Sequence, residues 1–165
     1  MGLPRKARVF WPVLITWFLA DCTTKDLAET HLLPHLPEPV LGEAVRLTLA
    51  YNQGAATGIS LGAYSRIGFS LIATFVVVML VGLYRKAAPH AWLTAGALGL
   101  VIAGALGNLF DRVRSARGVV DFIDLGIGSW RFWTFNLADV GVVCGAALLA
   151  WQLSREPGPT VEARP

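Results

Sequence analysis

Metal-binding motifs, paired cysteines and runs of basic residues are all missing from this sequence. The two cysteines, Cys22 and Cys144, lie far apart and form no CxxC pair or Cys/His cluster, so neither a disulfide framework nor a zinc site is predicted. No HExxH motif is present, which excludes that metalloprotease signature. The sequence therefore predicts a protein that holds no metal and needs no cofactor.

Charged residues are also scarce. They make up 15% of the 165 residues, whereas hydrophobic residues make up 55%, and the mean hydropathy is +0.56. Such a composition is too apolar for an ordinary soluble domain. The net charge of +3 could suggest a nucleic-acid partner, but no stripe of basic residues alternates with aromatic ones. We therefore expect membrane lipids around the chain, and no nucleic acid.

Long runs without charge predict the segments that cross the membrane, because about 20 apolar residues are needed to span roughly 30 Å of hydrocarbon. Three runs reach this length. A fourth does so only if its helix continues past Ala20 through Asp21 and Lys25, which can pair on one helix face. The predicted spans cover residues 9–30, 67–84, 91–110 and 132–151. They form one domain, residues 1–153, followed by a disordered cytoplasmic tail, residues 154–165.

The first apolar run allows a second interpretation. Arg5, Lys6 and Arg8 precede a short apolar core, as in a signal peptide, and the residues up to Cys22 imitate a cleavage box. Asp21, however, stands where such a box needs a small residue, which argues against cleavage there.

Two short runs predict strands. Residues 45–51 alternate strictly between apolar and polar side chains, and residues 119–123 are rich in β-branched residues. An even number of crossings places both on one side of the membrane. The predicted fold is an all-α membrane protein with four transmembrane helices and a small extracytoplasmic β element.

Lysine and arginine set the predicted orientation. Each side of the membrane carries seven of them, so we follow the cluster Arg5, Lys6 and Arg8, because the first helix usually dominates. Both termini are then cytoplasmic. Small residues repeat every four positions within the third and fourth spans and predict close helix packing; they are Ala95, Gly99, Ala103, Gly107, Gly141 and Gly145.

Asp121 and Asp139 are the candidates for chemistry. A charge at membrane depth costs about 2.5 to 3.5 kcal/mol, so a chain that retains one tends to use it. Asp121 lies in the loop that leads into the span holding Asp139, on the same face of the bilayer. Two such carboxyl groups can share a proton and hydrolyse a peptide bond. Pairing with an arginine such as Arg112, or a proton or ion relay, are the alternatives that these residues leave open.

The chain resembles the bacterial lipoprotein signal peptidases, also called signal peptidase II, from Asp21 to Asp139. Five blocks occur in the order of that family: Asp21-Cys22-Thr23-Thr24-Lys25, Tyr51-Asn52-Gln53-Gly54-Ala55-Ala56, Gly107-Asn108-Leu109-Phe110-Asp111-Arg112, Val119-Val120-Asp121-Phe122 and Phe135-Asn136-Leu137-Ala138-Asp139.

The resemblance implies an aspartic endopeptidase with Asp121 and Asp139 as its catalytic pair. It implies that further residues of these blocks bind substrate or support the site: Asp21, Lys25, Asn52, Gly54, Asn108, Asp111, Arg112, Asn136 and Ala138. The implied substrate is a lipid-modified prolipoprotein, cut before its diacylglyceryl cysteine, and the implied location is the bacterial cytoplasmic (inner) membrane, with the active site near the outer face. We expect a monomer. A proton-coupled transporter and a purely structural four-helix membrane protein are the alternatives.

The sequence departs from the family pattern at three places. Cys22 replaces the usual glutamine, Thr57 replaces the usual phenylalanine, and the spacing from Arg112 to Asp121 is one residue longer than is common, which makes Asp124 a rival for Asp121. Residues 58–62 also fit the serine-hydrolase pattern G-x-S-x-G around Ser60. The only histidine after Ser60 is His90, which is predicted to lie on the opposite side of the membrane, so a serine mechanism is not expected.

Overall fold

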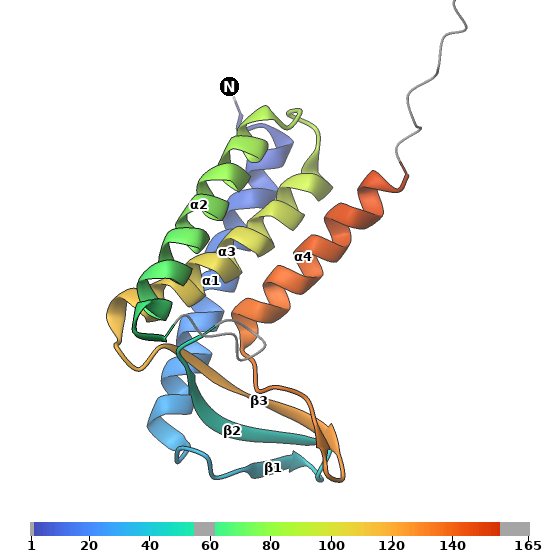
Figure 1. Cartoon of the computed structure of the whole chain (residues 1–165). Coiled ribbons are helices and arrows are strands. Elements are labelled where there is room, and N and C mark those ends of the chain that lie inside the picture. Colours follow the sequence, from blue (N-terminus) through green and yellow to red (C-terminus); the bar gives the residue numbers. More distant parts are fainter. Residues whose placement is uncertain (1, 55–61, 156–165) are drawn as a thin grey trace, which may run out of the picture.

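The computed structural model describes residues 2–54 and 62–155 and contains a helical bundle with a small sheet at one end (Figure 1). The main helices are α1 (Arg5–His31), α2 (Ser65–Lys86), α3 (Trp92–Arg114) and α4 (Leu137–Leu153). A 3-10 turn, η1 (Gly62–Tyr64), precedes α2. The described N-terminal residues lie at the end of the bundle opposite the sheet, as seen in Figure 1.

Helix α1 continues through its polar segment, as predicted. It has 27 residues, which is about 40 Å of helix at 1.5 Å per residue. Two helices, α2 and α3, are long and apolar enough to cross a membrane, and α4 is a shorter apolar helix. The helical bundle with an antiparallel sheet is confirmed, while the count of four spans stays a prediction.

The start of the last helix was predicted too early. Helix α4 begins at Leu137, and residues 132–136 are extended beside strand β3 (Val119–Ile127). The N–H of Phe132 donates to Leu125 O at 2.7 Å, and that of Phe135 to Ile123 O at 3.0 Å. These sheet-like hydrogen bonds keep the apolar segment out of the helix. Asp139 therefore lies in the first turn of α4, and not deep within a span.

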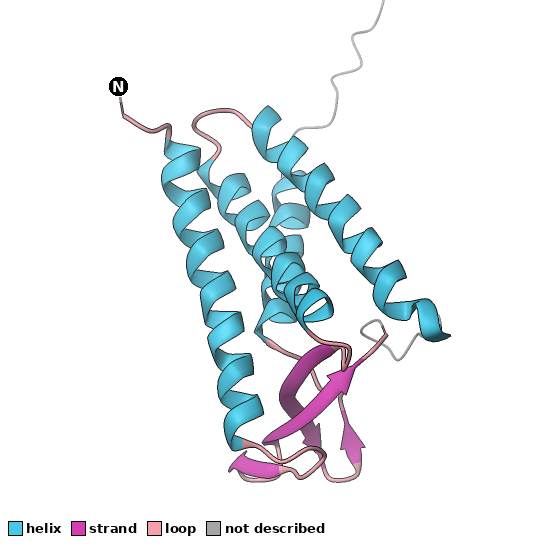
Figure 2. Ribbon diagram, turned by 90° about the vertical axis from the view of Figure 1, so that its left-hand side faces the viewer, coloured by secondary structure: helices cyan, strands magenta, loops and turns pink. Residues whose placement is uncertain are grey.

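The sheet has the strand order β1-β2-β3-β4, and all neighbours are antiparallel. Strands β1 (Glu38–Leu41), β2 (Val45–Asn52) and β4 (Trp130–Arg131) accompany β3, and Figure 2 shows the sheet gathered below one end of the helices. The two predicted strands are present, and both are longer than expected. Ala50 pairs with Asp121, so the end of β2 lies beside Asp121.

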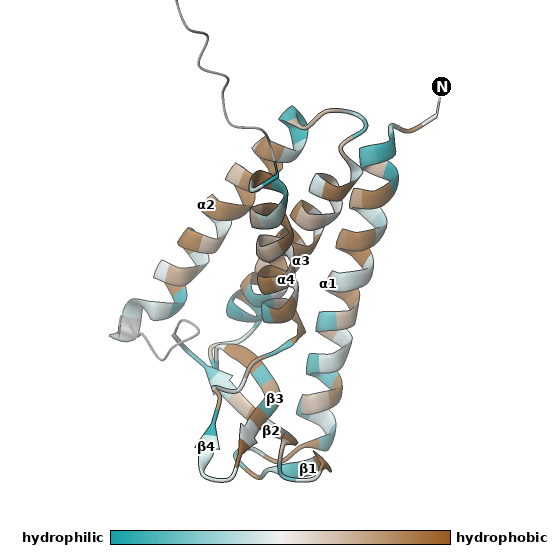
Figure 3. Ribbon diagram, turned by 90° about the vertical axis from the view of Figure 1, so that its right-hand side faces the viewer, coloured by the Kyte–Doolittle hydropathy of each residue, from teal (hydrophilic) through white to brown (hydrophobic). Residues whose placement is uncertain are grey.

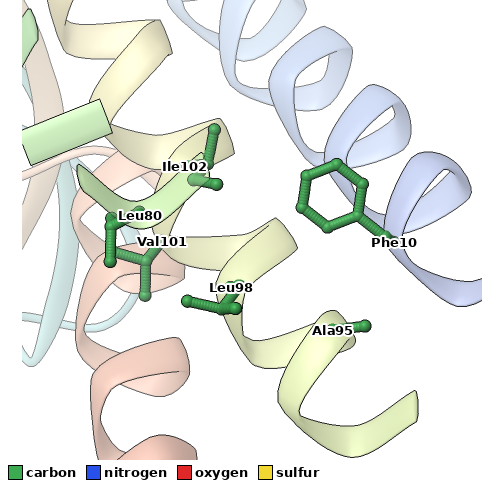
Figure 4. Close-up of a cluster of buried hydrophobic side chains, with 6 residues drawn as sticks. All are labelled: Phe10, Leu80, Ala95, Leu98, Val101 and Ile102. Atoms are coloured by element: carbon green, nitrogen blue, oxygen red, sulfur yellow. The ribbon is translucent and has the colours of Figure 1, made fainter. Parts of the chain in front are cut away.

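Helix α3 forms the centre of the bundle. Its Leu98 and Ile102 pack in a cluster with Phe10 of α1 and Leu80 of α2 (Figure 4). The small residues permit this contact, because a Cβ atom at Gly107 would collide with the Asp21 carboxylate of α1. A Cβ atom at Gly145 would likewise collide with Ala97 and Val101 of α3. The predicted packing role of the small residues is confirmed.

Helix α2 exposes most of its apolar surface. Only Ser65 and Leu80 are buried in it, while Leu71 and Phe75 are 67% and 70% exposed. Figure 3 shows this helix as predominantly hydrophobic along its length. Such a surface suits a lipid environment. Of the predicted tail, residues 156–165 lie outside the described residues.

Candidate functional site

Asp121 and Asp139 lie in the wall of one cavity of about 640 Å³. Strand β3 supplies Asp121, which is buried, and the first turn of α4 supplies Asp139, which is half-buried. The polar part of the cavity wall also contains Asn52, Asn108 and Arg112. Its apolar part comes mainly from α2, α4 and the segment before α4, including Phe69, Ile72, Trp133, Val140 and Val143.

Asn136 connects the two carboxyl groups. Its Nδ2 donates to Asp121 Oδ1 at 2.6 Å, and its backbone N–H donates to Asp139 Oδ2 at 3.2 Å. Its Oδ1 accepts from the Asp139 N–H at 3.0 Å, which completes a capping box at the start of α4. Asn136 therefore both caps α4 and connects the two acids by hydrogen bonds.

Two further asparagines complete the hydrogen bonding of the acids. Asn52 Nδ2 donates to Asp121 Oδ2 at 3.1 Å, and Asn108 Nδ2 donates to Asp139 Oδ1 at 2.9 Å. Each carboxyl oxygen of both acids therefore accepts a hydrogen bond. The donors come from β2, α3 and the residue before α4, so the geometry of the acids depends on how these elements pack.

Burial raises the pKa of Asp121 to about 7, and the nearby charge of Asp139 acts in the same direction. The hydrogen bonds from Asn52 and Asn136 oppose this change without overcoming it. Two close carboxyl groups in a poorly hydrated site cannot both ionise cheaply. The arrangement thus favours a proton on Asp121 near neutral pH.

Lys25 is the centre of a buried ionic cluster beside the acids. Its Nζ lies 2.8 Å from Asp21 Oδ2 and 2.9 Å from Asp111 Oδ2, and it donates to Asn108 Oδ1 at 2.9 Å. Asp21 and Lys25 are 0% and 1% exposed. The predicted pairing of these two residues on one face of α1 is confirmed.

The two carboxylates of this cluster also hold the backbone next to the catalytic candidates. Asp21 Oδ1 accepts from the Ala138 N–H at 2.8 Å, directly before Asp139. Asp111 Oδ2 accepts from the Val120 N–H at 3.2 Å, directly before Asp121. Sequence reasoning missed both contacts, because the interacting residues are 117 and 9 positions apart and no local pattern relates them.

Arg112 contacts backbone, and not a carboxylate. Its Nη2 donates to Gly54 O at 2.9 Å and its Nη1 to Asn108 O at 3.1 Å. Gly54 is itself held by its N–H, which donates to Asn52 Oδ1 at 2.9 Å. Among residues 2–54 and 62–155, Arg112 makes no ion pair. Arg112 therefore makes no direct ion pair with Asp139, although the charges of Asp121 and Asp139 lie near enough to act on its guanidinium.

Asp124 is part of an ion-pair cluster on the sheet. Its Oδ2 accepts from Arg46 at 2.8 Å and from Thr48 at 3.0 Å, and its Oδ1 accepts from Arg131 at 2.7 Å. Burial alone would raise the pKa of Asp124, but hydrogen bonds from Arg131, Arg46 and Thr48 outweigh it and lower the pKa. An odd spacing along a strand also turns Asp124 away from the face of Asp121.

The remaining candidates of the sequence are placed as follows. Ser60 and Thr57 lie outside the described residues. The loop between α2 and α3, which contains His90, lies at the end of the bundle opposite the sheet (Figure 1). Cys22 is half-buried in α1 as a free thiol. Within the described part of the chain, no three His, Cys, Asp or Glu residues gather in a way that could hold a metal ion.

Comparisons with known proteins give one consistent result. The family model described as Signal peptidase (SPase) II matches residues 13–155. A lipoprotein signal peptidase of Hydrogenovibrio crunogenus is 40% identical over 142 residues, which cover 84% of this chain and 80% of that protein. One of Mycobacterium avium is 41% identical over 151 residues, which cover 88% and 79%.

Solved structures agree with the sequence matches. A bacterial membrane enzyme solved by the in meso method at 2.3 Å resolution superposes with a TM-score of 0.80 and 29% identity, covering 93% of this chain and 92% of the other. A second, at 1.9 Å resolution, gives a TM-score of 0.78 and 31% identity, covering 88% and 92%.

Proposed function

The chain belongs to the signal peptidase II family, and from this we propose that it removes signal peptides from diacylglyceryl-modified prolipoproteins, cutting before the lipidated cysteine. Similar proteins from several bacteria carry the name lipoprotein signal peptidase. The structural observation behind this proposal is that Asn136 joins Asp121 and Asp139 in one cavity wall. The proposed enzyme is therefore an aspartic endopeptidase.

In the proposed reaction, Asp139 is the base and Asp121 is the acid. Asp139 lies at the positive end of the α4 dipole, which stabilises negative charge there. Its carboxylate takes a proton from a water molecule, whose oxygen attacks the carbonyl carbon of the scissile bond. Asp121 donates its proton to the developing oxyanion, which gives a neutral gem-diol. As the C–N bond breaks, Asp139 passes the proton taken from water to the leaving nitrogen, and Asp121 recovers a proton from a hydroxyl of the gem-diol. The products are a carboxylic acid and an amine, as hydrolysis requires.

The polar residues around the acids have two proposed tasks. Asn52, Gly54, Asn108, Arg112 and Asn136 orient the acids and the substrate backbone, since amides and guanidinium groups supply directed hydrogen bonds. The second group braces the elements that carry the acids, through the hydrogen bonds and ion pairs already described; it comprises Asp21, Lys25, Asp111 and Ala138.

The apolar helices support a placement in the membrane. We propose four spans in the bacterial inner membrane, both termini in the cytoplasm, and the sheet with the two acids at the outer face. The cavity has apolar walls from α2 and α4, so a signal helix and acyl chains can reach the acids laterally from the bilayer. The acids gather at one end of the bundle, whereas a proton-coupled transporter needs ionisable groups along a path near the midplane. A monomer is sufficient for this site.

A cleavage assay tests this function. The purified chain is incubated with a synthetic prolipoprotein carrying diacylglyceryl-cysteine, and with a matched precursor in which the cysteine is unmodified. We expect a new N-terminus at the lipidated cysteine, and at least about tenfold slower cleavage of the unmodified precursor. Equal cleavage of both precursors would contradict lipid-dependent substrate choice, and no cleavage of either would contradict the peptidase function.

A further inference from the structure

A second cavity lies between α1 and α3, with one residue from α4, and runs from the middle of the bundle toward the end opposite the acids. It measures about 530 Å³. Its walls are almost entirely apolar and include Val9, Pro12 and Val13 of α1 and Trp92, Gly96 and Leu100 of α3. The indole N–H of Trp17 in the same wall is already used, because it donates to Leu137 O at 2.9 Å. We call this cavity the α1–α3 groove.

The mouth of the α1–α3 groove is basic. Arg5 lies one helical turn before Val9 on the same face of α1, and its guanidinium lies 5.1 Å from the ring centre of Trp92 in the groove wall. Among residues 2–54 and 62–155, this end of the bundle carries no acidic residue; its basic residues are Arg5, Lys6, Arg8, Arg85, Lys86 and Arg155. A negatively charged group is therefore favoured here.

The walls fit an acyl chain better than a second helix. Helices associate in membranes through small residues repeated at four-residue spacing. Here the residues four positions before and after Gly96 are Trp92 and Leu100. Gly96 lies in the groove wall, and even a Cβ atom added there would press on Val9 Cγ1, at 3.3 Å. A single apolar chain can lie in the groove where two helix backbones cannot approach closely.

We propose that the α1–α3 groove binds an anionic phospholipid of the leaflet that contains the N-terminus, with one acyl chain over Gly96 and the phosphate near Arg5. The lipid would fill the space between α1 and α3, whose packing also positions Asp21 and Asn108 at the other end. This proposal depends on the membrane placement proposed above and not on the peptidase chemistry.

Native mass spectrometry of the full chain in a nonionic detergent tests the proposal. The probes are 1-palmitoyl-2-oleoyl-phosphatidylglycerol and the phosphatidylethanolamine with the same acyl chains. The wild-type chain is expected to retain one phosphatidylglycerol in preference to phosphatidylethanolamine. Arg5→Ala should weaken this binding about fivefold, which corresponds to the roughly 1 kcal/mol that one basic residue contributes at an anionic membrane surface. Arg85→Ala, at the same end but on α2, should leave it unchanged.

Gly96→Leu places a large side chain in the groove wall and should abolish preferential retention. Gly82→Leu adds the same side chain to α2, where nothing lies within 4 Å of the added Cβ, and should not. Both leucine variants should still cleave the lipidated precursor, which separates this test from that of the peptidase. Equal retention of phosphatidylglycerol by the wild type, Arg5→Ala and Gly96→Leu would overturn the proposal. A mass of two chains without lipid would also overturn it, because a second copy would then occupy the groove.

Discussion

The side-chain amide of Asn108 has a single orientation toward Asp139. Its Oδ1 accepts from Lys25 Nζ at 2.9 Å and from Asn136 Nδ2 at 3.1 Å, which leaves Nδ2 to donate to Asp139 Oδ1 at 2.9 Å. A flipped amide would present Nδ2 to the Lys25 ammonium and Oδ1 to the Asp139 carboxylate, and both contacts would be repulsive. The buried lysine thus fixes a hydrogen bond to the proposed base.

Asn108→Asp tests this orientation with almost no change in shape. The new carboxylate can still accept from Lys25 and Asn136, but it places an oxygen, and not a donor, against Asp139. We expect about a hundredfold loss of kcat at neutral pH, with partial recovery at lower pH as the new carboxyl group becomes protonated and donates.

The control for Asn108→Asp is Asn108→Ala, which removes the donor without adding charge. It should lose activity at all pH values without acid recovery. Identical pH profiles for the two variants would contradict the role given to the amide, and each is measured as initial cleavage rate between pH 5 and 8.

The raised pKa of Asp121 predicts how activity depends on pH. Because burial raises it to about 7 from an ordinary 3.8, the proton that the mechanism needs is lost as pH rises through 7, and kcat should fall there. A rate that rises steadily from pH 6 to pH 9 would contradict the assignment of Asp121 as the acid.

The same pKa predicts a change in stability. Between pH 3.8 and about 7 the folded chain retains a proton on Asp121 that the unfolded chain has lost. The stabilising contribution of this group is therefore complete below pH 3.8 and is lost as pH rises through about 7. The thermal midpoint of the wild type should fall relative to that of Asp121→Asn between pH 5 and pH 8, measured in one detergent. Parallel curves would contradict the raised pKa.

Lys25→Met leaves two buried carboxylates, Asp21 and Asp111, without their cation. Removing one partner of a buried ion pair costs about 3 to 5 kcal/mol, so we expect a large fall in the thermal midpoint. Adding Asp111→Asn should restore part of it, because one unpaired charge is removed.

Lys6→Met is the matched control for Lys25→Met. Lys6 Nζ donates to the carbonyl oxygens of Tyr84, Arg85 and Ala87, so its loss leaves no unpaired charge. The loss of stability should be clearly smaller than for Lys25→Met. A larger loss of stability for Lys6→Met than for Lys25→Met would contradict the importance given to the buried ionic cluster.

Local sequence patterns predicted part of this structure. The four-residue spacing of Asp21 and Lys25 predicted their pairing, because helix geometry alone places them on one face. The alternation of apolar and polar residues predicted residues 45–51 of β2. Hydropathy failed at residues 132–136, which are as apolar as a span yet bond to β3, and β1, which contains Pro39 and is exposed, gave no strand signal.

The site was predictable as a set of residues but not as a geometry. The resemblance supplied the names of Asn108, Asn136 and Asp111, while their partners depend on contacts between distant segments. No pattern in the sequence indicates that Asp21 accepts a hydrogen bond from the Ala138 N–H. Nor does any pattern indicate that Asp124 forms ion pairs with Arg46 and Arg131. Such contacts arise from the packing of α1, α3 and the sheet, which only the folded chain reveals.

The central claim, that Asp121 and Asp139 together hydrolyse the peptide bond, is tested most directly by the cleavage rates of Asp121→Asn and Asp139→Asn on the lipidated precursor. We predict that each loses between about 10² and 10⁴-fold in kcat while remaining folded. Asp124→Asn is the control on the same strand. It should lose stability, because Arg46 and Arg131 lose their carboxylate, and should keep kcat within a few fold. Full activity of either Asp121→Asn or Asp139→Asn would contradict the claim.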